Sequence, residues 1–212
     1  MVKRCQEMIW NYVVKGILIG LIFGVPAGAI GALTIQRTLE RGFMAGLITG
    51  AGSSAADLLY SAAGIFGIAI VADFLTAHQN VFQVVGGVFI VALGISILRK
   101  KGRTDAAQET KGNLVFCFLS SFGTAVMNPA TILSFMVAFA AFDINGNVSA
   151  AEGAGLILGI LGGTFGWWLT ISSVVALLKD RITDQIYKWL NKILGSFMLL
   201  FGIVMMIRSA WS

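Results

Sequence analysis

The sequence predicts an all-α integral membrane protein with six transmembrane helices, and three observations support this fold class. The chain has 212 residues, of which 57% are hydrophobic and 12% are charged, whereas roughly 25% of the residues in an average soluble protein are charged. The mean hydropathy is +0.86. The charged residues gather in short connectors between apolar runs, and roughly 20 apolar residues suffice for a helix to cross a bilayer.

The first predicted helix covers residues 16–36, which contain no charged side chain. A cleaved signal peptide is the competing interpretation, because Ala27-Gly28-Ala29 matches the small-residue pattern of a cleavage site. The glycine pattern of this segment continues through that point. We therefore favour a retained helix.

The second and third predicted helices complete the first half of the chain. The second lies within residues 42–72 and has one ionisable side chain, Asp57, near its middle. The third is uncharged from Gln79 to Leu98 and is followed by Arg99. Both runs are long enough to cross the hydrocarbon core.

Three further helices are predicted in the second half. They lie within residues 112–142, within residues 153–178 and at about residues 193–207. The last run has only fifteen uncharged residues. Because this is shorter than a usual span, we expect Lys192 and Arg208 at its ends to extend toward the membrane surface.

The positions of lysine and arginine predict an orientation. With six crossings, both termini lie on one side, together with the second and fourth connectors. That side holds Lys3, Arg4, Lys15 and Arg208. The opposite side holds Arg37, Arg41, Arg99, Lys100, Lys101, Arg103, Lys111, Lys179, Arg181, Lys188 and Lys192. Eleven basic residues against four indicate that the termini face outward and the first, third and fifth connectors face the cytoplasm.

The chain reads as one domain built from two related halves, at about residues 11–100 and 112–208. Three helices per half is an odd number, so the second copy must be inverted in the membrane. Chance similarity between apolar helices is the alternative. The matching features are Gly87-Val88-Phe89 with Gly195-Ser196-Phe197, Gly94-Ile95 with Gly202-Ile203, and Pro26 with Pro129, each proline interrupting the first helix of its half.

Asp57 is the candidate functional carboxylate. A charged carboxylate at the bilayer centre costs about 2.5–3.5 kcal/mol on insertion scales, and such residues usually have a function. The alternative is a carboxyl group that is hydrogen-bonded by nearby serines and only fixes helix packing. The residues that share its helix face, at intervals of three and four, are Gly50, Ser53, Ser54, Ser61 and Gly64.

Two prolines predict helix breaks at a central site. Pro26 lies between Gly24 and Gly28, and Pro129 follows Asn128 on a polar stripe that includes Thr124. A proline removes a backbone donor and leaves carbonyl groups unpaired, which protein, water or ligand must satisfy within a membrane. Close helix packing is the competing interpretation of the glycines.

The remaining reactive side chains do not form recognisable sites. Cys5 and Cys117 are too far apart in sequence for a paired-thiol redox motif. His78 is the only histidine and has no cluster of metal ligands beside it. We expect no enzyme activity, no cofactor, no metal site and no nucleic-acid partner.

The sequence resembles the lysine exporter (LysE/RhtB type) family of bacterial amino-acid exporters. The matching residues, which span nearly the whole chain, are Gly24-Val25-Pro26-Ala27-Gly28, Arg41-Gly42, Ala45-Gly46-Leu47, Ala56-Asp57-Leu58, the helix-3 glycine before Arg99, and Asn128-Pro129. The sequence departs from the family at Val25 and Ala27, where the family commonly has a glycine and a polar residue.

The resemblance implies a secondary active exporter of amino acids or similar small polar metabolites, coupled to protons or to the membrane potential. It also implies a multi-pass protein of the bacterial cytoplasmic membrane, and the GxxxG faces allow a homo-oligomer. A divalent-metal exporter of the same superfamily is the main alternative, and a non-transporting scaffold is another. The predicted residues for substrate or proton binding are Asp57, Asn128, Pro129, Pro26, Gly24, Gly28, Ser53, Ser54 and Thr124.

Overall fold

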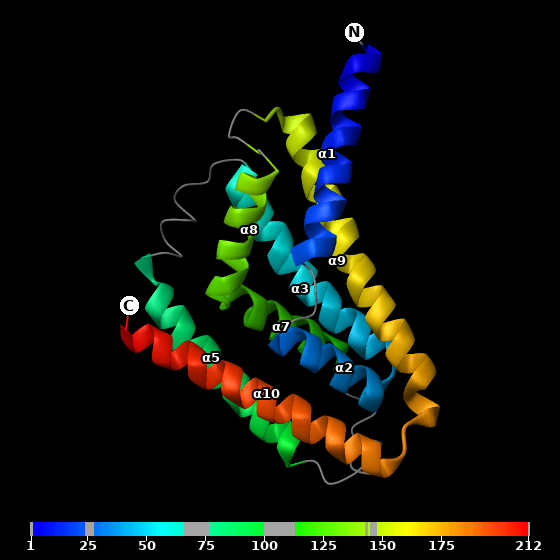
Figure 1. The fold of residues 1–212 in the computed structure, drawn as a ribbon, viewed down its shortest axis with the longest axis vertical. Coiled ribbons are helices and arrows are strands. Elements are labelled where there is room, and N and C mark those ends of the chain that lie inside the picture. The colour runs from blue at the N-terminus through cyan, green and yellow to red at the C-terminus, as the bar shows by residue number, and fades with distance from the viewer. Residues whose placement is uncertain are drawn as a thin grey trace.

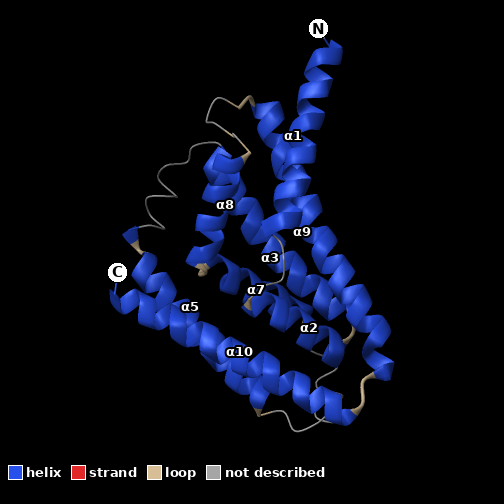
Figure 2. Ribbon diagram, in the orientation of Figure 1, coloured by secondary structure: helices blue, strands red, loops and turns tan. Residues whose placement is uncertain are grey.

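The computed structural model describes residues 2–23, 28–65, 77–99, 113–142, 144 and 148–211, and within these ranges the regular elements are all helical (Figures 1 and 2). The helices are α1 (Val2–Phe23), α2 (Ala29–Arg41), α3 (Phe43–Ile65), α5 (Gln79–Leu98), α7 (Leu114–Val126), α8 (Pro129–Ala141), α9 (Ala150–Leu178), the short 3-10 helix η1 (Lys179–Arg181) and α10 (Asp184–Trp211). The predicted all-α class is confirmed for this part of the chain.

Within the described residues, two helices are long and apolar enough to cross a membrane by length and composition. They are Ala150–Arg181, with a mean hydropathy of 1.6, and Asp184–Ser209, with a mean hydropathy of 2.0. The second is the predicted sixth helix, which is longer than expected because α10 begins at Asp184. Its first turns are amphipathic, with Tyr187 buried and Trp189 exposed, so polar residues there do not end the helix.

The predicted first helix is two helices in the structure. α1 ends at Phe23, and α2 begins after Gly28, whose φ of 145° strongly favours glycine. The predicted residues Gly24 and Pro26 lie outside the described residues. The predicted fourth helix is also two helices, since α7 ends at Val126 and α8 begins at Pro129. Proline can begin a helix but cannot donate a hydrogen bond within one, which accounts for this second break.

Two helix pairs form the long edges of the molecule (Figure 1). α1 runs parallel to α9, and a Cβ added at Gly16 would lie only 2.2 Å from the Leu156 carbonyl oxygen. α5 runs antiparallel to α10. A Cβ at Gly87 would lie 2.9 Å from the Gly202 carbonyl oxygen, and one at Gly94 would lie 3.0 Å from that of Gly195. Glycine is needed in these contacts because the backbones touch.

α3 lies at the centre of the fold and contacts α2, α7 and α9. It runs antiparallel to α9, with the Trp168 side chain packed on Gly50 and a hydrogen bond from Thr164 to Ser54 one turn further along α3. α2 runs antiparallel to α3, which follows it in the chain, and also contacts α7, α9 and α10. This arrangement encloses α2 on several sides, although its sequence is the most polar among the longer helices.

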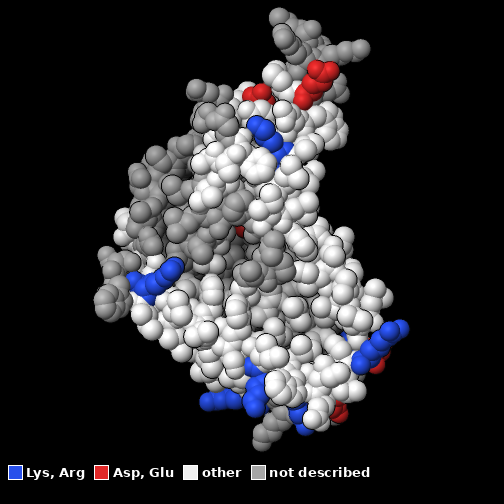
Figure 3. Space-filling model, viewed as in Figure 1, with Lys and Arg blue, Asp and Glu red and all other residues white. Residues whose placement is uncertain are grey.

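The surface is apolar over long stretches of helix. Large side chains such as Leu158, Leu177 and Leu200 are 65%, 79% and 63% exposed. Figure 3 shows charged side chains near the N-terminal end of α1, around the α9–α10 turn and at the C-terminal edge, and the described surface between them is almost entirely uncharged. Exposed apolar areas of this extent are typical of a surface that meets lipid.

Candidate functional site

A buried polar column follows the face of α3 that is turned toward α2 and α7. Thr49, Ser53 and Asp57 recur at four-residue spacing on this face, and none of them is more than 8% exposed. The residues that we assign to this polar column are Thr34 and Arg37 from α2, Thr49, Ser53 and Asp57 from α3, and Ser120, Ser121 and Thr124 from α7; all of these side chains are buried.

Asp57 lies at one end of the polar column and is 8% exposed. Among the described residues, none is recorded as a hydrogen-bond partner of its carboxyl group. The serines that could bind it make other bonds. Ser54 accepts a hydrogen bond of 3.1 Å from Thr164 on α9, and Ser61 donates one of 3.0 Å to the Leu58 carbonyl oxygen. Asp57 is therefore a buried acid without a hydrogen-bond partner among the residues that the structure describes.

The break between α7 and α8 contains Met127 and Asn128 and lies at the C-terminal end of α7. The backbone amide of Asn128 donates a hydrogen bond to the backbone carbonyl oxygen of Ala125 at 3.1 Å. The Val126 carbonyl oxygen accepts a hydrogen bond from the Tyr60 hydroxyl of α3. The protein itself thus satisfies a carbonyl group at the break, which sequence analysis left open to protein, water or ligand. The Thr124 hydroxyl is bound within α7, to the Ser120 carbonyl oxygen at 2.7 Å.

Asn128 is half-buried, and its backbone carbonyl oxygen accepts a hydrogen bond of 3.0 Å from the backbone amide of Thr131. Pro129 is the first residue of α8. At the other break, the position of a Cβ on Gly28 has no atom within 4 Å. The break at Gly28 therefore has free space beside its backbone, whereas the backbone groups described at the α7–α8 break are hydrogen-bonded within the protein.

Arg37 occupies the other end of the polar column, and sequence analysis missed it because it was assigned to a connector. Its side chain is 4% exposed. One guanidinium nitrogen donates to Thr49 Oγ1 at 3.1 Å and to the Cys117 carbonyl oxygen at 2.9 Å, and the other donates to Ser120 Oγ at 2.7 Å. The guanidinium carbon also lies 5.7 Å from the centre of the Phe116 ring. Arg37 thereby joins α2, α3 and α7.

A second buried contact of α2 reaches α10. The Tyr187 hydroxyl donates to Glu40 Oε1 at 2.8 Å, and these side chains are 1% and 5% exposed. The apolar residues Ala32, Ile35 and Leu39, at spacings of three and four, were the available signal that this charged stretch is helical and buried. In this segment, the presence of charged residues does not indicate an exposed connector.

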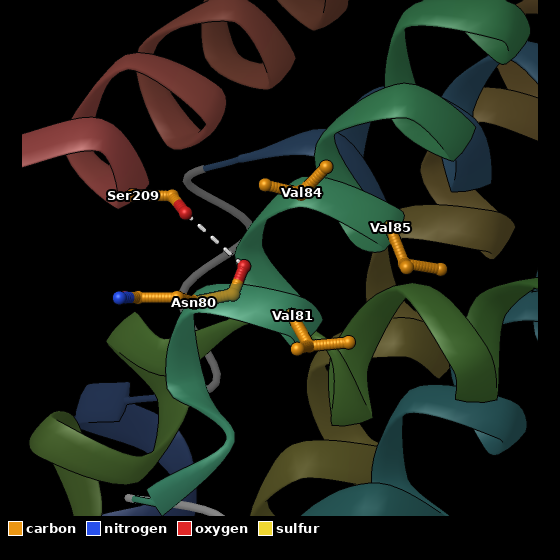
Figure 4. A pocket seen from close by; sticks show the side chains of 5 residues that line it. All are labelled: Asn80, Val81, Val84, Val85 and Ser209. Carbon is orange, nitrogen blue, oxygen red and sulfur yellow. Dashed lines mark hydrogen bonds between the residues drawn. The ribbon is translucent and has the colours of Figure 1, made fainter.

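Elsewhere the structure has an open groove of about 330 Å³ between the start of α5 and the end of α10 (Figure 4). It is lined by Asn80, Val81, Val84, Val85 and Ser209, and Ser209 Oγ donates to the Asn80 carbonyl oxygen at 3.1 Å. The groove contains no ionisable side chain, so the polar column is the better candidate. Within the described ranges, no three histidine, cysteine, aspartate or glutamate residues are grouped as metal ligands.

Comparison with known proteins identifies one matching protein family and several similar proteins. The model for the LysE type translocator family matches residues 21–209. YcgF of Bacillus subtilis, whose name gives amino acid efflux as its assumed role, is 28% identical over 202 residues, which cover 91% of this chain and 93% of YcgF. The threonine efflux protein of Salmonella typhi is 24% identical over 156 residues, covering 71% of this chain and 75% of that protein. No solved structure matches the chain.

Proposed function

The chain belongs to the LysE type translocator family, and on that premise we propose that it is a secondary active exporter of amino acids or similar small polar metabolites. The proposal includes coupling to protons or to the membrane potential, and placement in a bacterial cytoplasmic membrane with both termini outside. Amino acid efflux is in the names of two similar proteins. A transporter of this kind is no enzyme and needs no cofactor.

The observation that carries the proposal is the buried polar column. A helical protein with an apolar surface does not need eight buried polar side chains at the junction of three helices for its stability. Asp57 at one end has no hydrogen-bond partner among the described residues, which suits a group that takes up a proton or an ammonium group during each cycle. Polar side chains that line a path through an apolar bundle are typical of transport proteins.

We further propose six membrane crossings in two inverted repeats, with α1–α2 and α7–α8 each counting as one broken helix. Under this repeat Gly87 corresponds to Gly195, and Gly94 corresponds to Gly202. The contact of Gly94 with Gly195 then becomes the contact of Gly202 with Gly87, and the structure has both. The parallel pair of α1 with α9 likewise corresponds to the pair of α7 with α3. These correspondences support a two-fold relation.

The proposed roles of the site residues follow from their chemistry. Asp57 binds a proton or the substrate ammonium group. Asn128 offers an amide with both donors and acceptors, which suits a zwitterion. The breaks at Pro129 and at Pro26, together with Gly24 and Gly28, provide backbone groups beside the substrate. Ser53 and Thr124 line the path between α3 and α7, whereas Ser54 lies on the side of α3 that faces α9.

An export assay tests this function. Cells that express the chain and are loaded with dipeptides should release at least one amino acid faster than cells with an empty vector. The Asp57→Asn variant keeps the shape of the side chain and removes its charge. We expect it to insert normally and to lose accumulation of the substrate outside against a gradient, because no proton can be exchanged at residue 57.

Ser172→Ala is a suitable control, since it alters a buried hydroxyl outside the polar column. Uphill export by Asp57→Asn at the native rate would make Asp57 a structural residue. If the chain releases no amino acid but lowers the cellular content of a divalent cation, the metal-exporter alternative replaces our proposal.

A further inference from the structure

Arg37 is a buried cation whose recorded acceptors are all uncharged. Its three hydrogen bonds go to two hydroxyl groups and one backbone carbonyl. Among the residues that the structure describes, no carboxylate lies within ion-pair distance of its guanidinium group. Glu40 acts on Arg37 as a more distant negative charge, and a buried cation without a direct ion-pair partner still carries a desolvation cost. The geometry therefore leaves this cation able to bind an anionic group.

Two buried hydroxyls beside the Arg37 contacts have no hydrogen-bond partner among the residues that the structure describes. Thr34 Oγ1 and Ser121 Oγ are both unpaired, and both side chains are 0% exposed. Thr34 lies one turn from Arg37 on α2, and Ser121 lies one turn from Cys117 on α7, so each is on the helix face that takes part in the Arg37 contacts. A buried hydroxyl without a partner is unfavourable for the folded protein unless it serves another purpose.

We propose that Arg37, with Thr34 and Ser121, binds the carboxylate group of the transported molecule; this inference rests on the proposed export function. A carboxylate accepts two parallel hydrogen bonds from a guanidinium group, and bonds between ions are about twice as strong as those between neutral groups. The carboxylate would replace the Thr49 and Ser120 hydroxyls as acceptors. The second carboxylate oxygen would accept from the two unpaired hydroxyls.

This site is too far from Asp57 for one bound α-amino acid to contact both charged residues at the same time. Thr49, which contacts Arg37, is eight residues before Asp57 on α3, roughly 12 Å along the helix axis. This separation exceeds that between the carboxylate and ammonium groups of one α-amino acid. The two charged residues therefore act in succession, with Arg37 at one end of the polar column and Asp57 at the other.

Binding of paired probes to the purified full chain tests the inference. The probes are threonine, leucine and lysine, each compared with its carboxamide, which keeps the amine and replaces the carboxylate by a neutral group. Isothermal titration should show that the native protein binds at least one acid about 10- to 100-fold more tightly than its amide. Arg37→Gln should remove that preference.

Arg37→Gln also removes three hydrogen bonds and could fail to fold, so two milder variants accompany it. Thr34→Val and Ser121→Ala delete hydroxyls that have no recorded partner, and they should leave thermal stability unchanged or slightly higher. We expect each to weaken binding of the acid about tenfold while binding of the amide is unchanged. Ser172→Ala removes another unpaired buried hydroxyl, away from α7 and beside Gly46, and should leave both affinities unchanged.

The outcomes separate this inference from the proposed function. If the native protein prefers the acid and a folded Arg37→Gln variant keeps that preference, Arg37 is a structural residue, and the exporter proposal stands without this site. If only the Thr34 and Ser121 variants bind the acid as tightly as the native protein, those two hydroxyls take no part in binding and the proposed three-residue site is wrong. If the native protein binds acid and amide with equal affinity, the carboxylate is not recognised. If none of the three acids binds, this site is overturned for these probes, and release of amino acids in the export assay then decides separately whether the exporter proposal stands.

Discussion

Tyr60 shows how one residue stabilises an interrupted helix. Pro129 has no amide hydrogen, so α7 cannot continue its hydrogen-bond ladder into α8. The Tyr60 hydroxyl of α3 donates to the Val126 carbonyl oxygen at the end of α7. The break therefore depends on a side chain from a neighbouring helix, one turn from Asp57.

We predict that Tyr60→Phe destabilises the protein by about 1–3 kcal/mol, because a partly buried carbonyl group loses its donor. Thermal unfolding in detergent micelles measures the effect. Tyr12→Phe is the matched control, since the Tyr12 ring lies under the Lys15 ammonium group at 5.4 Å and a phenyl ring keeps that contact. Equal loss of stability in the two variants would show that the Tyr60 hydroxyl does not support the break.

Single residues also show where the sequence was misleading. Asp57 could be predicted as a buried acid because a long apolar run surrounds it. Arg37 could not, because a basic residue near the end of an apolar run is usually in a connector. Its burial depends on acceptors from α3 and α7 that are distant in sequence, and no local pattern identifies them.

Among the helices, α5 was predicted with its observed bounds, Gln79–Leu98, because the apolar run ends at Arg99. α10 was predicted too short, since its amphipathic first turns were read as a connector. The break at Asn128-Pro129 was predicted from proline chemistry. Pairing of the helices was not predicted in detail, because glycines show that backbones approach closely without showing which partner they meet.

The α1–α9 pair gives a prediction about helix packing. A Cβ at Gly159 would lie 2.2 Å from the Val13 carbonyl oxygen, whereas one at Gly162, on the same helix, has no atom within 4 Å. Gly159→Ala should separate the two helices and lower thermal stability by about 1–3 kcal/mol. Gly162→Ala should be neutral or stabilise the protein by up to about 1 kcal/mol through higher helix propensity. Equal effects of the two substitutions would contradict the close pairing.

The start of α9 gives a prediction about pH. Ser149 and Glu152 form a capping box, in which Glu152 Oε2 accepts from the Ser149 hydroxyl at 2.6 Å and from its amide at 2.9 Å. These hydrogen bonds hold the pKa of Glu152 below its ordinary value of 4.5. A lowered pKa stabilises the folded state above the ordinary pKa, and this contribution is lost as the pH falls through the pKa of the folded state.

We therefore expect Glu152→Gln to be less stable than the native protein at neutral pH, and the difference to shrink below pH 4.5. Glutamine can still cap the helix but does not titrate. Thermal unfolding of both proteins from neutral to acidic pH gives the comparison, with Glu7→Gln as a control for an exposed acid. A difference that grows in acid would mean that the capping box does not favour the ionised carboxylate.

At the scale of the whole molecule, three long-range hydrogen bonds bring together chain segments that six crossings would place on common sides. Lys15 donates to the Phe142 carbonyl oxygen, so the N-terminal helix meets the connector before α9. Ser209 donates to Asn80, which brings the C-terminal end to the start of α5. The bond of Tyr187 to Glu40 brings the start of α10 to the end of α2. An even number of crossings agrees with all three contacts.

The last prediction concerns orientation. Removing the buried Arg37 from the eleven basic residues of one side leaves ten against four, so the charge bias still favours termini outside. A reporter that is active only in the cytoplasm should be silent after Ser212. It should be active within the third connector near Gly102 and, as an internal control on the same side, after Thr183 between α9 and α10. Activity after Ser212 and silence at the other two positions would reverse the orientation. Activity at all three positions would show that α10 does not cross the membrane, although its length and composition allow it to do so.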